Sequence, residues 1–113
     1  MSVVLYHNPK CSTSRDTLAL LREQGVEPTV VEYLKTGWDR ETLQRLASKM
    51  GVGLSGLLRK KEADAKALLD AGADDEAILA AAIAQPILIE RPIVETDKGA
   101  VIGRPVERVL DVL

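Results

Sequence analysis

The chain has 113 residues, 46% of them hydrophobic, and a formal net charge of -2. This length suits one domain with its own core, and the near-neutral charge gives no general footprint for nucleic acid or for an anionic membrane. The chain has one cysteine, which excludes an internal disulfide and a metal site built from several cysteines. It also has one histidine, which excludes a metal site built from several histidines.

The predicted elements begin with a strand, a helix and a second strand. Residues 3–6 form a short apolar run typical of a buried strand. Ser12 and Thr13 are candidate capping residues of the helix that follows, and Gly25 is placed to end it. Residues 30–33 predict the second strand, which we expect to lie parallel to the first because a helix joins them.

Helical patterns dominate the middle of the chain. Asp39 is a candidate N-cap of a helix in which Leu43 and Leu46 face inward. Further helices are predicted at about residues 54–69 and 74–84.

The end of the chain predicts a hairpin and a last helix. Asp97-Lys98-Gly99 is a hairpin signal before a strand at residues 100–102. Pro105 is placed to open a helix that continues through Leu113. The order of elements therefore predicts an α/β fold with a mixed sheet.

The lone cysteine, Cys11, is the most informative residue. It lies between the first strand and the first helix, where unpaired backbone N–H groups and the helix dipole favour a thiolate. Lys10 and Arg15 add positive charge, and His7 would add a third charge if it were protonated. Most free cysteines are small buried apolar residues. Here the neighbours are residue types of loops and helix caps, which favours a reactive nucleophile.

Ser14 occupies the position of the second cysteine in a C-x-x-C redox pair. Cys11 therefore has no internal partner and needs an outside thiol to turn over. Ser14 either donates a hydrogen bond to the thiolate or caps the helix, and His7 either supports the thiolate or is a hydrogen-bonded strand-end residue. A C-x5-R phosphate loop is excluded, because Thr17 stands where that loop needs arginine.

Two arginines interrupt apolar segments near the C-terminus. Arg91 and Arg104 each precede a proline, which biases them toward extended backbone. For either residue alone a surface ion pair, with Glu90 or Glu107, is the simpler interpretation. Two such steps in one small domain favour a site for a tetrahedral oxyanion, which the guanidinium fork suits.

The segment at residues 6–15 closely resembles the active-site segment of the glutaredoxin-coupled arsenate reductases, the ArsC family. Similar segments follow in the same order at residues 57–60, 86–94 and 103–105. The resemblance extends over essentially the whole chain.

This resemblance implies a thioredoxin-like fold, α/β with βαβ before ββα and a mixed four-stranded sheet. It implies one domain over residues 1–113, with a helical insertion at about residues 38–85. The Arg91-Pro92 peptide bond would be cis.

The resemblance also assigns residue roles. Cys11 would be the nucleophile, with His7 tuning its thiolate and Ser14 hydrogen-bonded to it. Three arginines would hold arsenate: Arg59, Arg91 and Arg104. Composition alone does not distinguish Arg59 from other basic residues.

The implied reaction converts arsenate, or a similar oxyanion, through an adduct of arsenic with Cys11. Glutathione would be the co-substrate and glutaredoxin the protein partner, with no tightly bound cofactor and no metal. We expect a cytoplasmic protein, since residues 1–6 lack the regions of a signal peptide. We also expect a monomer that binds neither nucleic acid nor membrane. Two alternatives are a general glutathione-dependent thiol oxidoreductase of the same fold and a non-enzymatic regulator that binds RNA polymerase.

Overall fold

The computed structural model describes residues 2–113, and the chain divides into two compact units. The first unit runs up to Thr36 and resumes at Arg91 to the C-terminus, and the second is Gly37–Glu90. The single domain with an insertion at about residues 38–85 stays a prediction.

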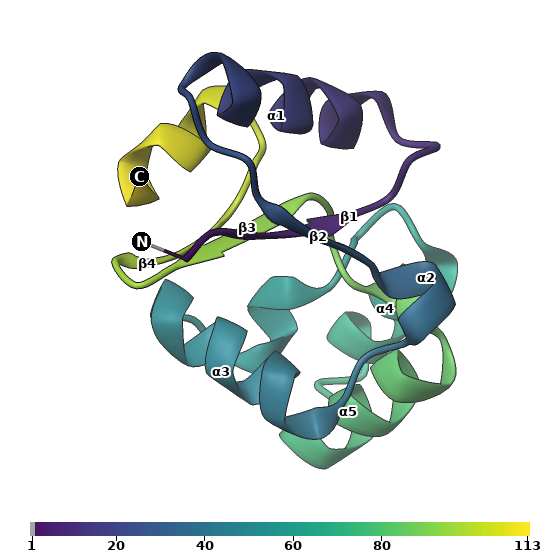
Figure 1. Ribbon diagram of the computed structural model, residues 1–113. Helices are drawn as coiled ribbons and strands as arrows, with labels where there is room; N and C mark the ends of the chain where they lie inside the picture. The colour runs from purple at the N-terminus through teal and green to yellow at the C-terminus, as the bar shows by residue number, and fades with distance from the viewer. Residues whose placement is uncertain (1) are drawn as a thin grey trace. The chain divides into compact units, whose positions relative to one another are not determined.

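The first unit contains a mixed four-stranded sheet of order β2-β1-β3-β4 (Figure 1). β1 (Val4–His7) pairs in parallel with β2 (Thr29–Glu32) and antiparallel with β3 (Ile93–Thr96). β3 continues through the predicted hairpin into β4 (Gly99–Ile102). The predicted α/β class and the mixed four-stranded sheet are confirmed.

The core of this unit lies between the sheet and two helical segments. α1 (Ser12–Glu23) joins β1 to β2, and the 3-10 helix η3 (Val106–Val112) lies on the same side of the sheet as α1 (Figure 1). The buried cluster is aliphatic and consists of Val3, Leu5, Leu21, Val94, Val109 and Val112. Leu21 belongs to this cluster, so its burial anchors the C-terminal half of α1 to the core.

Both ends of α1 were predicted, and one prediction is wrong. Gly25 follows the helix with φ +76°, the left-handed conformation that glycine adopts without steric cost, as predicted. Cys11 rather than Ser12 is the N-cap residue, and no side chain caps the helix there. The reason is a turn in which the Cys11 N–H donates to the Asn8 carbonyl over 3.0 Å, so the helix starts directly after the cysteine.

The predicted last helix is 3-10 throughout its length, and Pro105 is its N-cap residue rather than its first residue. Three valines at a spacing of three residues explain this difference: Val106, Val109 and Val112. A 3-10 helix has three residues per turn, so this spacing aligns the three side chains on one face toward the core.

The second unit is helical. It contains α3 (Arg40–Met50), α4 (Ala63–Asp70), α5 (Asp75–Ala84) and the 3-10 helices η1 (Leu54–Leu57) and η2 (Pro86–Leu88), whereas the short α2 (Tyr33–Thr36) belongs to the first unit. Asp39 caps α3 by accepting a hydrogen bond from the Thr42 N–H, and Leu43 and Leu46 are buried, as predicted.

The helix predicted at residues 54–69 is interrupted. Leu58 forms an isolated antiparallel bridge with Ile89, and the Arg59 N–H donates to the Leu88 carbonyl over 2.8 Å. The Glu90 N–H donates to the Leu57 carbonyl over 2.7 Å. These bonds replace helical ones, so α4 starts only at Ala63.

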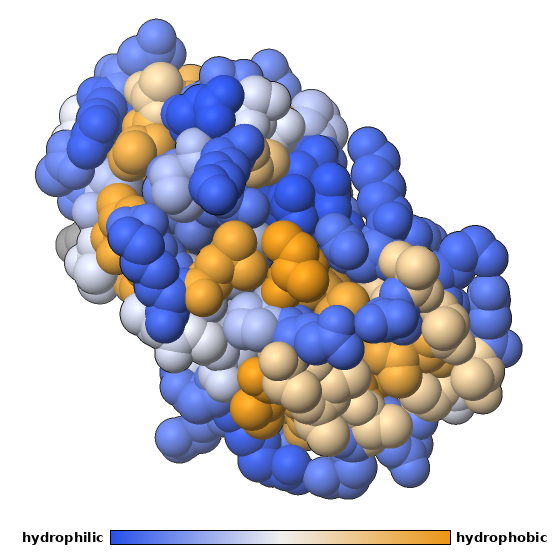
Figure 2. Space-filling view, turned by 90° about the vertical axis from the view of Figure 1, so that its right-hand side faces the viewer, coloured by the Kyte–Doolittle hydropathy of each residue, from blue (hydrophilic) through white to orange (hydrophobic). Residues whose placement is uncertain are grey.

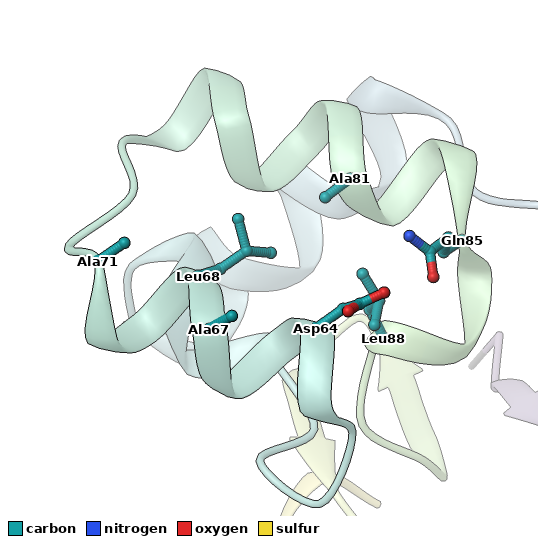
Figure 3. A pocket seen from close by; sticks show the side chains of 7 residues that line it. All are labelled: Asp64, Ala67, Leu68, Ala71, Ala81, Gln85 and Leu88. Carbon is teal, nitrogen blue, oxygen red and sulfur yellow. The ribbon is translucent and has the colours of Figure 1, made fainter.

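A cavity of about 310 Å³ lies between α4 and α5 (Figure 3). Leu68 points from α4 into it, while Asp64 and Gln85 lie together at one end (Figure 3). Its lining holds no cation and no nucleophile, so it is unsuited to an oxyanion.

Candidate active site

Cys11 is fixed by a short loop at the carboxyl end of β1. The Asn8 carbonyl accepts the Cys11 N–H, and the Asn8 side-chain Oδ1 accepts the Lys10 N–H over 3.0 Å. The half-buried thiol therefore lies at the N-terminus of α1, where the sequence places it. This is the positive end of the helix dipole.

The surroundings lower the pKa of the Cys11 thiol below its ordinary value. Burial is the largest single influence and raises this pKa. It is outweighed by a hydrogen bond from the Ser14 backbone, a hydrogen bond from the Arg91 side chain and the charges of Arg104 and Arg91. The thiolate, which is the nucleophilic form, is therefore favoured.

The hairpin brings the two Arg-Pro segments to this thiol. Ile93 and Ile102 are partners in the β3–β4 register, so the residues before β3 and after β4 meet at one edge of the sheet. Nη2 of Arg104 donates to Sγ of Cys11 over 3.5 Å, and Nε of Arg104 donates to the Arg91 carbonyl over 2.7 Å. Two guanidinium groups thus share one site with the thiolate.

The backbone between these segments is closely packed. Arg91-Pro92 is cis, as the resemblance implies, and Arg104-Pro105 is cis as well. The Gly103 N–H donates to the Pro92 carbonyl over 2.9 Å. A Cβ atom at Gly103 would lie 3.0 Å from Cγ of Pro92 and 3.2 Å from Oγ1 of Thr17. Only glycine fits there without displacement.

His7 and Ser14 form a buried pair that joins the end of β1 to the first turn of α1. Nδ1 of His7 lies 2.6 Å from Oγ of Ser14, which also accepts the Asn8 N–H over 3.1 Å. Burial lowers the pKa of His7 below 6.5, Glu32 opposes this shift and Arg15 adds to it. His7 is therefore neutral at pH 7 and does not supply the third positive charge.

The alternative that Ser14 caps the helix is wrong, because no side chain caps the N-terminus of α1. The hydroxyl interacts with His7 and the Asn8 backbone, and the Ser14 backbone approaches the thiolate. The catalytic roles of His7 and Ser14 stay predictions.

Arg59 lies in the second unit. Its Nη1 is 2.6 Å from Oε1 of Glu90, and both side chains are largely buried. Glu90, considered above as a partner for Arg91, thus forms an ion pair with Arg59. The assignment of Arg59 as the third oxyanion ligand stays a prediction.

Sequence reasoning missed Asn8 and Gly103. The Asn8-Pro9 dipeptide is a turn signal that indicates the loop, but the buried hydrogen bonds of Asn8 depend on the fold. Gly103 gives no local signal, because its restriction comes from Thr17 and Pro92, which are distant in sequence.

Residues 2–113 contain neither a cluster of metal ligands nor a helix suited to span a membrane. No group of three or more His, Cys, Asp or Glu side chains there could hold a metal ion. None of the described helices is both long and apolar enough to cross a membrane.

A nucleophilic thiol at the start of α1, with an Arg-Pro step against it, defines a thiol protein of the thioredoxin-like fold. A structure described as arsenate reductase from Vibrio cholerae superposes with a TM-score of 0.91 at 48% identity, covering 100% of this chain and 98% of that one. The model of the ArsC family matches residues 6–112. The chain belongs to the ArsC family.

Two relatives from other bacteria are similar over nearly the whole chain. A Rhizobium meliloti protein named arsenate reductase is 44% identical, with 100% of this chain and 82% of that protein aligned. The Escherichia coli protein named YfgD is 46% identical, with 98% of this chain and 96% of that protein aligned.

Proposed function

We propose that this protein is an arsenate reductase, an oxidoreductase that works as a cytoplasmic monomer with glutathione and glutaredoxin. The observation that carries the proposal is the pairing of a stabilised thiolate with two guanidinium groups, Arg104 lying 3.5 Å from Sγ of Cys11. The names of the Vibrio cholerae and Rhizobium meliloti relatives support arsenate as the substrate.

The arginines offset the repulsion between the Cys11 thiolate and an anionic substrate. Arsenate is mostly a dianion at neutral pH, so a thiolate that approaches it meets strong repulsion. Arg91 and Arg104 already stabilise negative charge at Cys11 and present forked donors that match a tetrahedral oxyanion. We also propose Arg59, which the family resemblance assigns, as a third cation for the oxyanion.

The reaction then proceeds by thiol exchange on arsenic. The Cys11 thiolate forms a sulfur–arsenic bond while one arsenate oxygen takes up two protons and leaves as water. Glutathione adds in the same way and expels a second oxygen as water. Glutaredoxin's thiolate then attacks the glutathione sulfur, and the sulfur–arsenic electron pair reduces arsenic(V) to arsenic(III). Hydrolysis releases arsenite and returns Cys11, consistent with a chain that has no second cysteine.

The test is NADPH oxidation coupled through glutathione reductase, in the presence of glutathione and glutaredoxin, with and without arsenate. We expect arsenate-dependent turnover that disappears in Cys11→Ser. No dependence on arsenate, in folded protein whose Cys11 still alkylates at neutral pH, would contradict the proposal. That result would favour the general thiol oxidoreductase, whose substrates are disulfides.

A further inference from the structure

A cavity of about 200 Å³ opens beside the loop that carries Cys11. Its walls are the four residues that precede Cys11, the last residue of β2, Glu32, and two residues of α2, Leu34 and Lys35. His7 and Glu32 are register partners in the parallel pair of β1 and β2, so both loops leave the sheet at one edge. None of the steps in the proposed reaction so far uses this cavity.

The cavity carries two cations and one anion. Lys10 and Lys35 supply the positive charges, Glu32 supplies the negative charge, and His7 is neutral at pH 7. Nζ of Lys35 lies 3.5 Å from Oε1 of Glu32, and the Lys35 side chain is 77% exposed. An exposed pair of this kind is weak, so Lys35 can exchange its partner for a ligand at little cost.

The wall also offers apolar surface. Leu34 is 43% exposed although it is a large hydrophobic residue, and Pro9 lies across the same cavity. On the face shown in Figure 2, hydrophobic side chains reach the surface both in separate spots among hydrophilic ones and in a broader tan and orange area. A ligand with charged ends and an apolar middle matches this lining.

We propose that the cavity binds glutathione, with Lys10 and Lys35 taking its carboxylates; this inference rests on the proposed function. At neutral pH glutathione carries two carboxylates and one ammonium group, the reverse of two lysines and one glutamate. Leu34 and Pro9 contact the body of the peptide. The cavity thus orients the co-substrate thiol at the reacting sulfur.

The dimensions agree. Neighbouring Cα atoms are about 3.8 Å apart, so Lys10 places the cavity wall one residue from Cys11. Glutathione is joined through the side-chain carboxyl of its glutamate, so it is longer than an ordinary extended tripeptide, which spans at most about 11 Å. Glutathione can therefore lie in the cavity and present its central cysteine to Cys11.

The experiment measures mixed-disulfide formation at Cys11 without arsenate. The Cys11 thiolate attacks one sulfur of a disulfide, the sulfur–sulfur bond breaks, and one thiolate leaves. Rates are compared for oxidised glutathione and for the uncharged hydroxyethyl disulfide, using mass spectrometry of quenched samples. The ratio of the two rates cancels any change in the reactivity of Cys11 itself.

We expect Lys35→Glu to lower this ratio about fivefold, the equivalent of one exposed ion pair. Lys35→Met, which adds no repulsion against Glu32, should lower it less and in the same direction. Lys66→Glu is the matched control, because Lys66 is an exposed lysine paired with Asp70 on α4. Its ratio should equal that of the unmodified protein.

An unchanged ratio in both Lys35 variants would overturn the inference. The inference would also fail if the Lys35 variants were impaired only when added glutaredoxin reduces the mixed disulfide, because that result would assign this surface to protein docking. Because the assay contains no arsenate, the two proposals fail separately. If the Lys35 variants lower the ratio but the unmodified protein does not turn over arsenate, the glutathione site stands and the reductase proposal fails. If the protein turns over arsenate but the ratio is unchanged in the variants, only the reductase proposal stands.

Discussion

The Nδ1 atom of His7 lies 2.6 Å from the Oγ atom of Ser14, and both side chains are buried. This contact joins the end of β1 to the first turn of α1, across the short loop that carries Cys11. A neutral imidazole makes one nitrogen a donor and the other an acceptor, so the tautomer of His7 decides the direction of the Ser14 hydroxyl. Positioning at this site therefore depends on a histidine that stays uncharged.

His7 should titrate below 6.5, because burial disfavours its charged form. The chain has one histidine, so the imidazole C–H signals in a proton NMR titration report on it alone. Since the folded-state pKa is lower than the unfolded one, stability should fall as the pH drops from 6.5 through the folded pKa. Arg15→Met should move the midpoint upward, and a midpoint above 6.5 in the unmodified protein would refute this account.

Ser14→Ala should lower the free energy of unfolding by about 1–3 kcal/mol, because the buried His7 Nδ1 and the Asn8 N–H lose their partner. Urea denaturation measures the loss. Ser12→Ala is the control, since Ser12 is exposed and caps nothing, and it should change stability by less than about 0.5 kcal/mol. Equal effects of both substitutions would show that the buried contact contributes nothing.

Arg91→Met should raise the pKa of Cys11, because it removes both a hydrogen bond to the thiolate and a nearby positive charge. The pH dependence of alkylation by iodoacetamide gives the midpoint directly. Arg91→Lys should keep part of the shift but lose most arsenate turnover, since an ammonium group cannot reproduce the fork. Arg108→Met, at an exposed position of η3, should leave the midpoint in place. An unmoved midpoint in Arg91→Met would remove Arg91 from the thiolate site.

Gly103→Ala should destabilise the protein by about 1–3 kcal/mol through overpacking against Pro92 and Thr17. The displaced backbone carries Arg104 with it, so arsenate turnover should fall in the protein that remains folded. Gly53→Ala is the control, because a Cβ atom there meets nothing closer than 3.8 Å. It should change stability by less than about 1 kcal/mol. Normal stability and normal turnover of Gly103→Ala would contradict the close approach.

Local signals predicted the elements that position the thiol. The βαβ opening and the Asp97-Lys98-Gly99 turn are both confirmed in the structure. Each depends on residues that are close in sequence, such as a cap or a hairpin turn. The meeting of Arg104 with Cys11 follows once those elements form one sheet.

The features that the sequence did not predict depend on distant partners. Residues 57–59 leave the helical pattern because they bond to residues 88–90, which no local window contains. The neutral state of His7 follows from its burial, and the constraint on Gly103 follows from packing across α1. Periodicity describes which residues are buried, but not which other segment covers them.

The most direct test of the central claim is the appearance of arsenite itself. Purified protein is incubated with arsenate, glutathione and glutaredoxin, and the two arsenic species are separated by chromatography and quantified. The account predicts arsenite in proportion to enzyme and time, and none above the enzyme-free level with Cys11→Ser. Arsenite formation that continues unchanged in Cys11→Ser would show that this thiolate is not the nucleophile.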